Sequence, residues 1–153
     1  MLEFDVDLAC WDLEASDAGS VITHLAARMA ARGCVAAEYG DQTLAREHQH
    51  PTGLPTRPFC IAFPHADATG VARSALAVAA LCRPVIFKNM ADPDEDLAVE
   101  IVFMLANRRP EEQIGTLRQL AELFGQAEKL AALRAQRDAA QAAAWLKVEL
   151  ALA

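Results

Sequence analysis

Two nearly continuous apolar segments, residues 75–82 and 97–106, constrain the fold of this chain more than any other feature. Glu100 is the only charged residue in either segment. Both are far shorter than the roughly 20 apolar residues that a membrane-spanning helix needs. Continuous apolar runs of this length are typical of strands that are buried on both faces. We therefore expect two central strands of a sheet that is covered by helices on each side.

Three further segments have strand patterns. Residues 2–8 alternate between apolar and acidic side chains, which predicts a half-buried strand. Residues 59–63 form a short apolar run that ends at Pro64, where a central strand cannot easily continue. Residues 84–87 are a candidate for one more short strand.

Helical spacing of apolar residues alternates with these strands. A first helix is predicted to begin at Asp17 or Ser20 and to end at Gly33. A second helix is predicted over residues 41–48, followed by a proline-rich loop over residues 49–58. The spacing then predicts a helix from Pro110 to Gly125 and a final helical region over residues 127–150.

This order of elements predicts the α/β class, with a mixed sheet flanked by helices on both faces. A length of 153 residues suits one domain over residues 1–153, and no repeat or internal linker divides the chain. The net charge of −7 argues against a nucleic-acid partner, which would need clustered basic residues. The acidic residues 1–5 do not resemble a signal peptide, and no run is long enough to insert into a membrane. We expect a cytoplasmic protein.

The cysteines agree with that location. Cys10, Cys34, Cys60 and Cys82 are widely spaced and form no C-x-x-C pair, so we expect reduced thiols that are mostly buried.

His65 is the histidine with the most informative setting. It follows the short strand and Pro64, at the kind of strand end where α/β folds expose functional side chains. A neutral imidazole is a nucleophile at pH 7, which suits phosphoryl transfer. Arg46 could hold two phosphate oxygens, and Gln113 with the amides of the helix near Pro110 could donate further hydrogen bonds.

The other histidines leave one alternative open. His24 fits a structural role within the first helix, and His48 and His50 fit exposed positions. His48, His50, Cys60 and His65 could instead supply the ligands of a metal-dependent enzyme, although their spacing matches no zinc signature. A nucleophilic pair of Cys60 and His65 is disfavoured, because their odd separation points them to opposite faces of a strand.

Two motifs carry a family resemblance. Residues 45–54 read AREHQHPTGL, and residues 60–66 read CIAFPHA. Together they resemble the enzyme IIA domains of the bacterial phosphoenolpyruvate-dependent sugar phosphotransferase system (PTS), in the fructose/mannitol superfamily. The sequence PTG at residues 51–53 and the pair Glu112 and Gln113 are most similar to the galactitol type. The order of elements matches over nearly the whole chain.

The resemblance implies a phosphocarrier without a cofactor. His65 would accept a phosphoryl group from the histidine phosphocarrier protein and pass it to a cysteine of a IIB component. Arg46 would stabilise the phosphorylated state, and Glu47, Thr52 and Gly53 would shape the pocket around it. Gln113 stands where mannitol and fructose members carry a second histidine.

Two questions stay open at this level. A regulatory IIA-like protein would use the same chemistry at His65 as a signal, without moving a sugar. In a transport system the membrane component IIC binds the sugar, so this chain does not reveal which sugar is carried. The acidic segment of residues 92–96 is expected to be a solvated loop away from His65 or at its rim, or otherwise a docking element.

Overall fold

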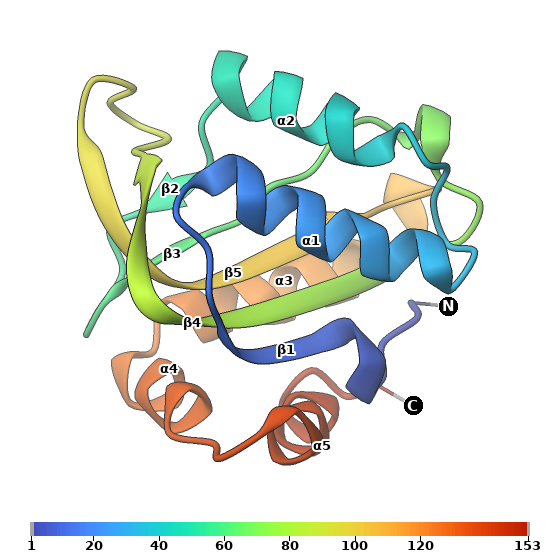
Figure 1. The fold of residues 1–153 in the computed structure, drawn as a ribbon. Helices are drawn as coiled ribbons and strands as arrows, with labels where there is room; N and C mark the ends of the chain where they lie inside the picture. The colour runs from blue at the N-terminus through green and yellow to red at the C-terminus, as the bar shows by residue number, and fades with distance from the viewer. Residues whose placement is uncertain (1, 153) are drawn as a thin grey trace.

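The two apolar segments lie side by side at the centre of the sheet, as predicted (Figure 1). In the computed structural model, which describes residues 2–152, they belong to the antiparallel strands β4 (Ala75–Lys88) and β5 (Asp96–Ala106). β1 (Ala9–Leu13) pairs parallel with β4, and β3 (Cys60–Ala62) pairs parallel with β5. The two-residue strand β2 (Gly53–Leu54) pairs antiparallel with β3 and completes the order β1-β4-β5-β3-β2.

Helices cover both faces of this mixed sheet, which confirms the predicted fold class (Figure 1). One face carries α1 (Ala18–Ala31) and α2 (Tyr39–Gln49). The other carries α3 (Ile114–Phe124), α4 (Ala127–Arg134) and α5 (Ala139–Glu149). None of the helices within residues 2–152 has the length and apolarity to cross a bilayer.

The predicted strand over residues 2–8 is wrong. Glu3 makes a single parallel bridge to Ala75, and Val6–Leu8 forms a 3-10 helix before β1 begins. The Asp5 side chain accepts the Val6 N–H at 2.8 Å and turns the chain there. A local Asp cap therefore overrides the alternating pattern, and Val6 is 44% exposed instead of facing the core.

Residues 84–87 do not form a separate strand. They belong to β4, which continues across a register shift between Ala80 and Val85. The bulge accommodates Pro84, which has no N–H to donate to β5.

The helix boundaries differ in detail from the prediction. Asp17, not Ser20, caps α1 by accepting the Ser20 N–H at 2.8 Å, and Gly33 follows the helix with a φ of 72°. The second helix begins at Tyr39, two residues before the predicted Asp41. These shifts are within the fraying that sequence patterns leave undefined at helix ends.

The C-terminal predictions need two corrections. Pro110–Glu112 forms only a 3-10 turn, and the α-helix itself starts at Ile114. The final helical region is two helices, because Asp138 starts α5 by accepting the Gln141 N–H at 2.8 Å. A side-chain cap inside an otherwise helical pattern starts a new helix in a new direction.

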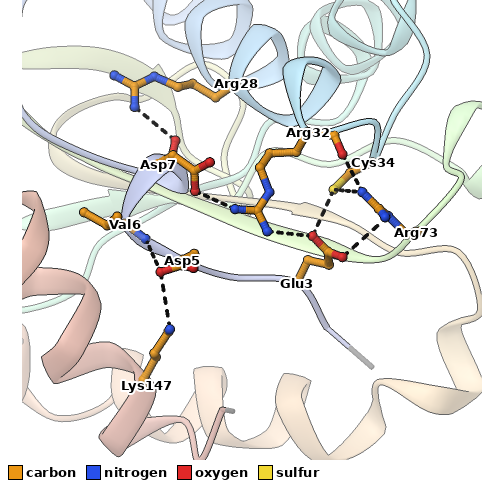
Figure 2. A network of polar contacts seen from close by, with 9 residues as sticks. All are labelled: Glu3, Asp5, Val6, Asp7, Arg28, Arg32, Cys34, Arg73 and Lys147. Carbon is orange, nitrogen blue, oxygen red and sulfur yellow. Dashed lines mark hydrogen bonds and ion pairs between the residues drawn. The ribbon is translucent and has the colours of Figure 1, made fainter.

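Ion pairs attach the N-terminal segment to the rest of the fold (Figure 2). Glu3 lies 2.9 Å from Arg32 and 3.5 Å from Arg73, and Arg32 also lies 2.7 Å from Asp7. The hydrogen bond from Arg32, and then the charge of Arg73, lower the pKa of the Glu3 carboxyl against the effect of burial. The Arg73 guanidinium also donates to the Arg32 carbonyl, so the C-cap of α1, the segment just before β4 and the N-terminal segment form one network.

This network and the loop that follows β3 lie at the same end of the sheet. Ala75 pairs with both Glu3 and Ala106, while Leu105 pairs with both Leu76 and His65. The N-terminal segment and His65 thus lie at the same end of the sheet, separated by β4 and β5.

Candidate functional site

His65 lies immediately beyond β3 and beside the last residues of β5. It is half-buried and forms an isolated parallel bridge with Leu105. The Leu105 N–H donates to the Pro64 carbonyl at 3.2 Å. The sheet therefore holds the backbone before His65 even though the strand has ended.

The imidazole of His65 has a defined tautomer. Its Nδ1 lies 2.8 Å from the carbonyl oxygen of Phe63. A carbonyl oxygen can only accept a hydrogen bond, so Nδ1 carries the proton and Nε2 keeps its lone pair. The ring also packs near Phe63, with 5.6 Å between ring centroids, and Phe63 in turn packs against Phe124 of α3. In the neutral ring this geometry leaves Nε2 as the nitrogen with a free lone pair.

A buried carboxylate supports the strand that carries His65. Glu47, near the end of α2, accepts hydrogen bonds from the Thr52 N–H at 2.8 Å and the Thr52 hydroxyl at 2.7 Å. The carbonyl and hydroxyl oxygens of Thr52 share the Phe63 N–H, each at 3.2 Å. Glu47, Thr52, Phe63 and His65 thus form a continuous chain of hydrogen bonds.

The charge of Glu47 depends on this environment. Burial raises the pKa of the Glu47 carboxyl, while the Thr52 hydrogen bonds and the nearby His65 and His48 side chains oppose that rise. The carboxylate is thus best satisfied when Thr52 donates to it and the His65 ring is cationic.

Arg46 is exposed on α2, next to Glu47 in sequence. Hydrogen bonds from Thr69 lower the pKa of the Asp67 carboxyl, and the charge of Arg46 contributes to the same shift. Within residues 2–152 the Arg46 guanidinium has no carboxylate within ion-pair distance. The side chain is therefore available to a new anion near the loop that follows His65.

Gly53 allows a close approach of two backbones. A Cβ at this position would lie 2.5 Å from the Lys88 carbonyl oxygen, so no other residue fits without movement. Gly53 bridges to Asn89, and its carbonyl accepts the Met90 N–H at 2.8 Å. Gly53 thus joins β2 to the tip of the β4–β5 hairpin, which carries the exposed acidic residues 92–96.

Gln113 is one of the residues expected at the site. It is 3% exposed and lies between the 3-10 turn and α3, where it is the N-cap residue of the helix. Its side chain makes no capping hydrogen bond, so its amide is not committed to the helix end.

A cavity of about 590 Å³ lies between the start of α1, the end of α2 and the β4–β5 hairpin. Glu47 and His48 are among its lining residues and His65 is not.

The metal hypothesis has no geometric support. Among residues 2–152, no three histidine, cysteine or acidic side chains are grouped as metal ligands would be. His48 and His50 are exposed near the end of α2, and Cys60 is half-buried in β3, where burial raises its thiol pKa.

Tyr39 is the residue that sequence reasoning missed. It is fully buried at the start of α2, and its hydroxyl accepts the Ala66 N–H at 3.2 Å and donates to the Leu105 carbonyl at 3.1 Å. In the sequence, Tyr39 lies just before a predicted helix with nothing to mark it, except that it is the only tyrosine of the chain.

Comparisons with known proteins identify the family of this chain. Residues 4–148 match the family described as phosphoenolpyruvate-dependent sugar phosphotransferase system, EIIA 2. The chain belongs to this EIIA family. It is 35% identical to the PTS system galactitol-specific EIIA component of Escherichia coli (strain K12) over 104 residues, which are 68% of this chain and 69% of the relative.

Solved structures of EIIA proteins share the fold. Enzyme IIAMTL of Escherichia coli, solved in complex with phosphorylated enzyme IIBMTL, superposes with a TM-score of 0.77 at 18% identity over 99% of each chain. The nitrogen regulatory protein IIA-Ntr from Neisseria meningitidis superposes with a TM-score of 0.74 at 23% identity, over 93% of this chain and 94% of the other. The predicted family resemblance is confirmed, and this EIIA protein is a component of a phosphotransferase system.

Proposed function

We propose that this EIIA protein carries a phosphoryl group on Nε2 of His65. It accepts the group from the histidine phosphocarrier protein and passes it to a cysteine of a IIB component, in the uptake of a galactitol-like sugar. The observation that carries the proposal is the hydrogen bond between Nδ1 and the Phe63 carbonyl, which leaves Nε2 unprotonated.

The transfer step is an exchange of nitrogen–phosphorus bonds. The Nε2 lone pair attacks the phosphorus, and the bond from phosphorus to the donor's imidazole nitrogen breaks, with its electron pair returning to that nitrogen. The His65 ring keeps its Nδ1 proton and becomes cationic. The Phe63 carbonyl and the buried Glu47 carboxylate then stabilise that charge.

Other residues would compensate the phosphoryl oxygens. Arg46, exposed and without a carboxylate partner, would pair with two of them. Gln113 can donate a neutral hydrogen bond but cannot become a cation, so charge compensation rests mainly on Arg46.

The partners follow from the relatives. The IIAMTL structure contains a phosphorylated IIB protein, which supports a IIB component as the acceptor here. Galactitol is the sugar in the name of the relatives at 35% identity. We also infer a cytoplasmic location, where the phosphocarrier protein and the membrane component IIC can both be reached.

Phosphorylation in vitro tests the proposal. We expect the wild type, incubated with phosphoenolpyruvate, enzyme I and the phosphocarrier protein, to gain one acid-labile phosphoryl group by mass spectrometry. His65→Ala should gain none, and His48→Ala should gain it as the wild type does. An unmodified wild type, or a modified His65→Ala protein, refutes the proposal.

Arg46 is tested by the rate of the same reaction. Arg46→Ala should slow transfer by on the order of a hundredfold, because one charge-stabilising donor is lost. Arg46→Lys should recover only part of the rate, since a lysine cannot bind two oxygens in a fork. An unchanged rate in Arg46→Ala removes this residue from the site.

The acceptor is tested by adding the cognate IIB component to the phosphorylated protein. Loss of the phosphoryl group to IIB is the expected result. A protein that is phosphorylated on His65 but transfers to no IIB would be a regulatory IIA-like protein instead.

A further inference from the structure

Tyr39 connects three parts of the molecule at the candidate site. Its hydroxyl donates to the Leu105 carbonyl at the end of β5 and accepts the Ala66 N–H immediately after His65. The side chain is fully buried, its hydrogen bond to Leu105 is buried with it, and the hydrogen bond from Ala66 is partly buried. A buried hydroxyl that both donates and accepts has no remaining freedom to rotate away from either partner.

These bonds complete a frame around His65. Leu105 uses its N–H to bind the Pro64 carbonyl, before His65, and its own carbonyl to accept from Tyr39. Tyr39 then binds Ala66, after His65. The peptide groups on both sides of the histidine are therefore fixed to β5, one directly and the other through Tyr39.

Gly70, further along the same loop, lies near the ring of Tyr39. A Cβ placed on Gly70 would lie 3.5 Å from Cδ1 of Tyr39, in van der Waals contact. The Gly70 carbonyl also accepts the Ala36 N–H at 2.8 Å, close to the start of α2. The loop between residues 65 and 70 is thus held near the start of α2 at both of its ends.

Packing alone does not require the hydroxyl. A phenylalanine would fill the same volume and would avoid the cost of removing a hydroxyl from water. The hydroxyl instead bonds two backbone groups, the Leu105 carbonyl and the Ala66 N–H, and both belong to the frame of His65.

We propose that Tyr39 is a positioning residue for phosphoryl transfer at His65. By fixing the Ala66 amide, it holds the backbone in the conformation that lets Nδ1 donate to Phe63 and leaves Nε2 free. The proposal rests on the function proposed above, but the state of the His65 ring can be measured without any phosphorylation.

Tyr39→Phe tests it with two readouts. In the wild type, ¹⁵N NMR of the imidazole should show His65 as the Nδ1–H tautomer, and in Tyr39→Phe we expect a mixture of both tautomers. Transfer from the phosphocarrier protein should slow roughly tenfold in kcat with little change in KM, because the nucleophile is misplaced while the docking surface is intact.

Ser74→Ala is the matched control. The Ser74 hydroxyl is also buried at this end of the sheet and also accepts a backbone N–H, from Arg108 at 2.9 Å. Losing the Ser74 hydroxyl should lower the free energy of unfolding by about as much as Tyr39→Phe does. It should change neither the His65 tautomer nor kcat. If Ser74→Ala changes both readouts as Tyr39→Phe does, the effect is general loosening and the proposal is overturned.

The remaining outcomes separate the two proposals. An unchanged His65 tautomer in Tyr39→Phe overturns the role of Tyr39, whether or not the wild type is phosphorylated. A wild type that is never phosphorylated, with the tautomer change present in Tyr39→Phe, refutes the phosphocarrier function alone.

A second variant guards against a folding defect. Since Tyr39 is the only tyrosine, biosynthetic incorporation of 3-fluorotyrosine alters this hydroxyl and no other. The Ala66 amide signal and the His65 ring nitrogens should both shift relative to the unlabelled protein. An Ala66 shift without any change at His65 contradicts the proposed coupling.

Discussion

Two irregular segments are attached to the same end of the sheet, and they are held in different ways. The loop that carries His65 donates hydrogen bonds to Thr52 and Tyr39, whose own hydrogen bonds to Glu47 and Leu105 are buried. The N-terminal segment is fixed mainly by ion pairs whose side chains remain in contact with water, such as Glu3 with Arg32 (Figure 2).

The two kinds of interaction differ in how much free energy is lost when one partner is removed. Water can replace a partly exposed ion-pair partner, so such pairs contribute roughly 0–1 kcal/mol and weaken with salt. A buried hydrogen bond has no replacement, and losing one partner costs about 1–3 kcal/mol for the group left unpaired. The loop that holds the proposed nucleophile uses the second kind of interaction, and the N-terminal segment uses the first.

The largest expected effect comes from Thr52→Val, which keeps the shape of the side chain. It removes the hydroxyl that donates to Glu47 and accepts from Phe63. The carboxylate is then left buried with the Thr52 N–H as its remaining donor, and we expect the free energy of unfolding to fall by about 2–4 kcal/mol at pH 7 in urea titrations.

The sign of the pH dependence follows from the raised pKa of Glu47. Losing a hydrogen bond that lowers the Glu47 pKa raises it further, so the carboxyl is protonated more easily in the folded variant. The cost of Thr52→Val should therefore shrink as the pH falls, and Glu47→Gln in the same chain should recover part of it. Thr56→Val, which removes a hydroxyl that donates to Phe59 without involving a carboxylate, is the control. If Thr52→Val and Thr56→Val lower the free energy of unfolding by the same amount, the buried Glu47 carboxylate adds nothing to the effect of Thr52→Val.

A smaller effect is expected for Glu3→Gln. It removes the charge that joins Arg32 to Arg73, and we expect a loss of about 1 kcal/mol at low salt and less at high salt. Because the folded-state pKa of Glu3 lies below its ordinary value of 4.5, this contribution is complete above pH 4.5 and is lost as the pH falls through the lowered pKa.

Glu122→Gln serves as the comparison for this variant, since Glu122 is exposed and makes no ion pair within residues 2–152. Its unfolding curve should match the wild type at all salt concentrations. The contrast between the two segments would be refuted if Glu3→Gln lowered the free energy of unfolding as much as Thr52→Val does, at every salt concentration.

Much of the fold was predictable from local pattern. The apolar runs that became β4 and β5 have no other stable place than the centre of a sheet. The pattern failed over residues 2–8, because it records which side chains are apolar and not where Asp5 caps a turn. It also extended the last helix through Asp138, where a cap of the same kind starts α5.

The sequence marked the candidate site residues in two ways. His65 stood out by its position after a short strand and Pro64, Arg46 by its ability to hold two phosphate oxygens, and the resemblance supplied Glu47 and Thr52. The resemblance also implied that Gly53 shapes the pocket, and the structure adds its close contact with Lys88. No local sequence pattern marked Tyr39, because its partners Ala66 and Leu105 lie 27 and 66 residues away in the chain.

The sequence by itself determined the class of the fold, the family and the identity of the proposed nucleophile, because these depend on residue types and on spacing within short segments. Only the tertiary structure decided which nitrogen of His65 is free, and which buried groups hold the ring in that state. Those properties depend on hydrogen bonds between residues that are distant in the chain, and such bonds exist only once the sheet has brought α2, β3 and β5 together.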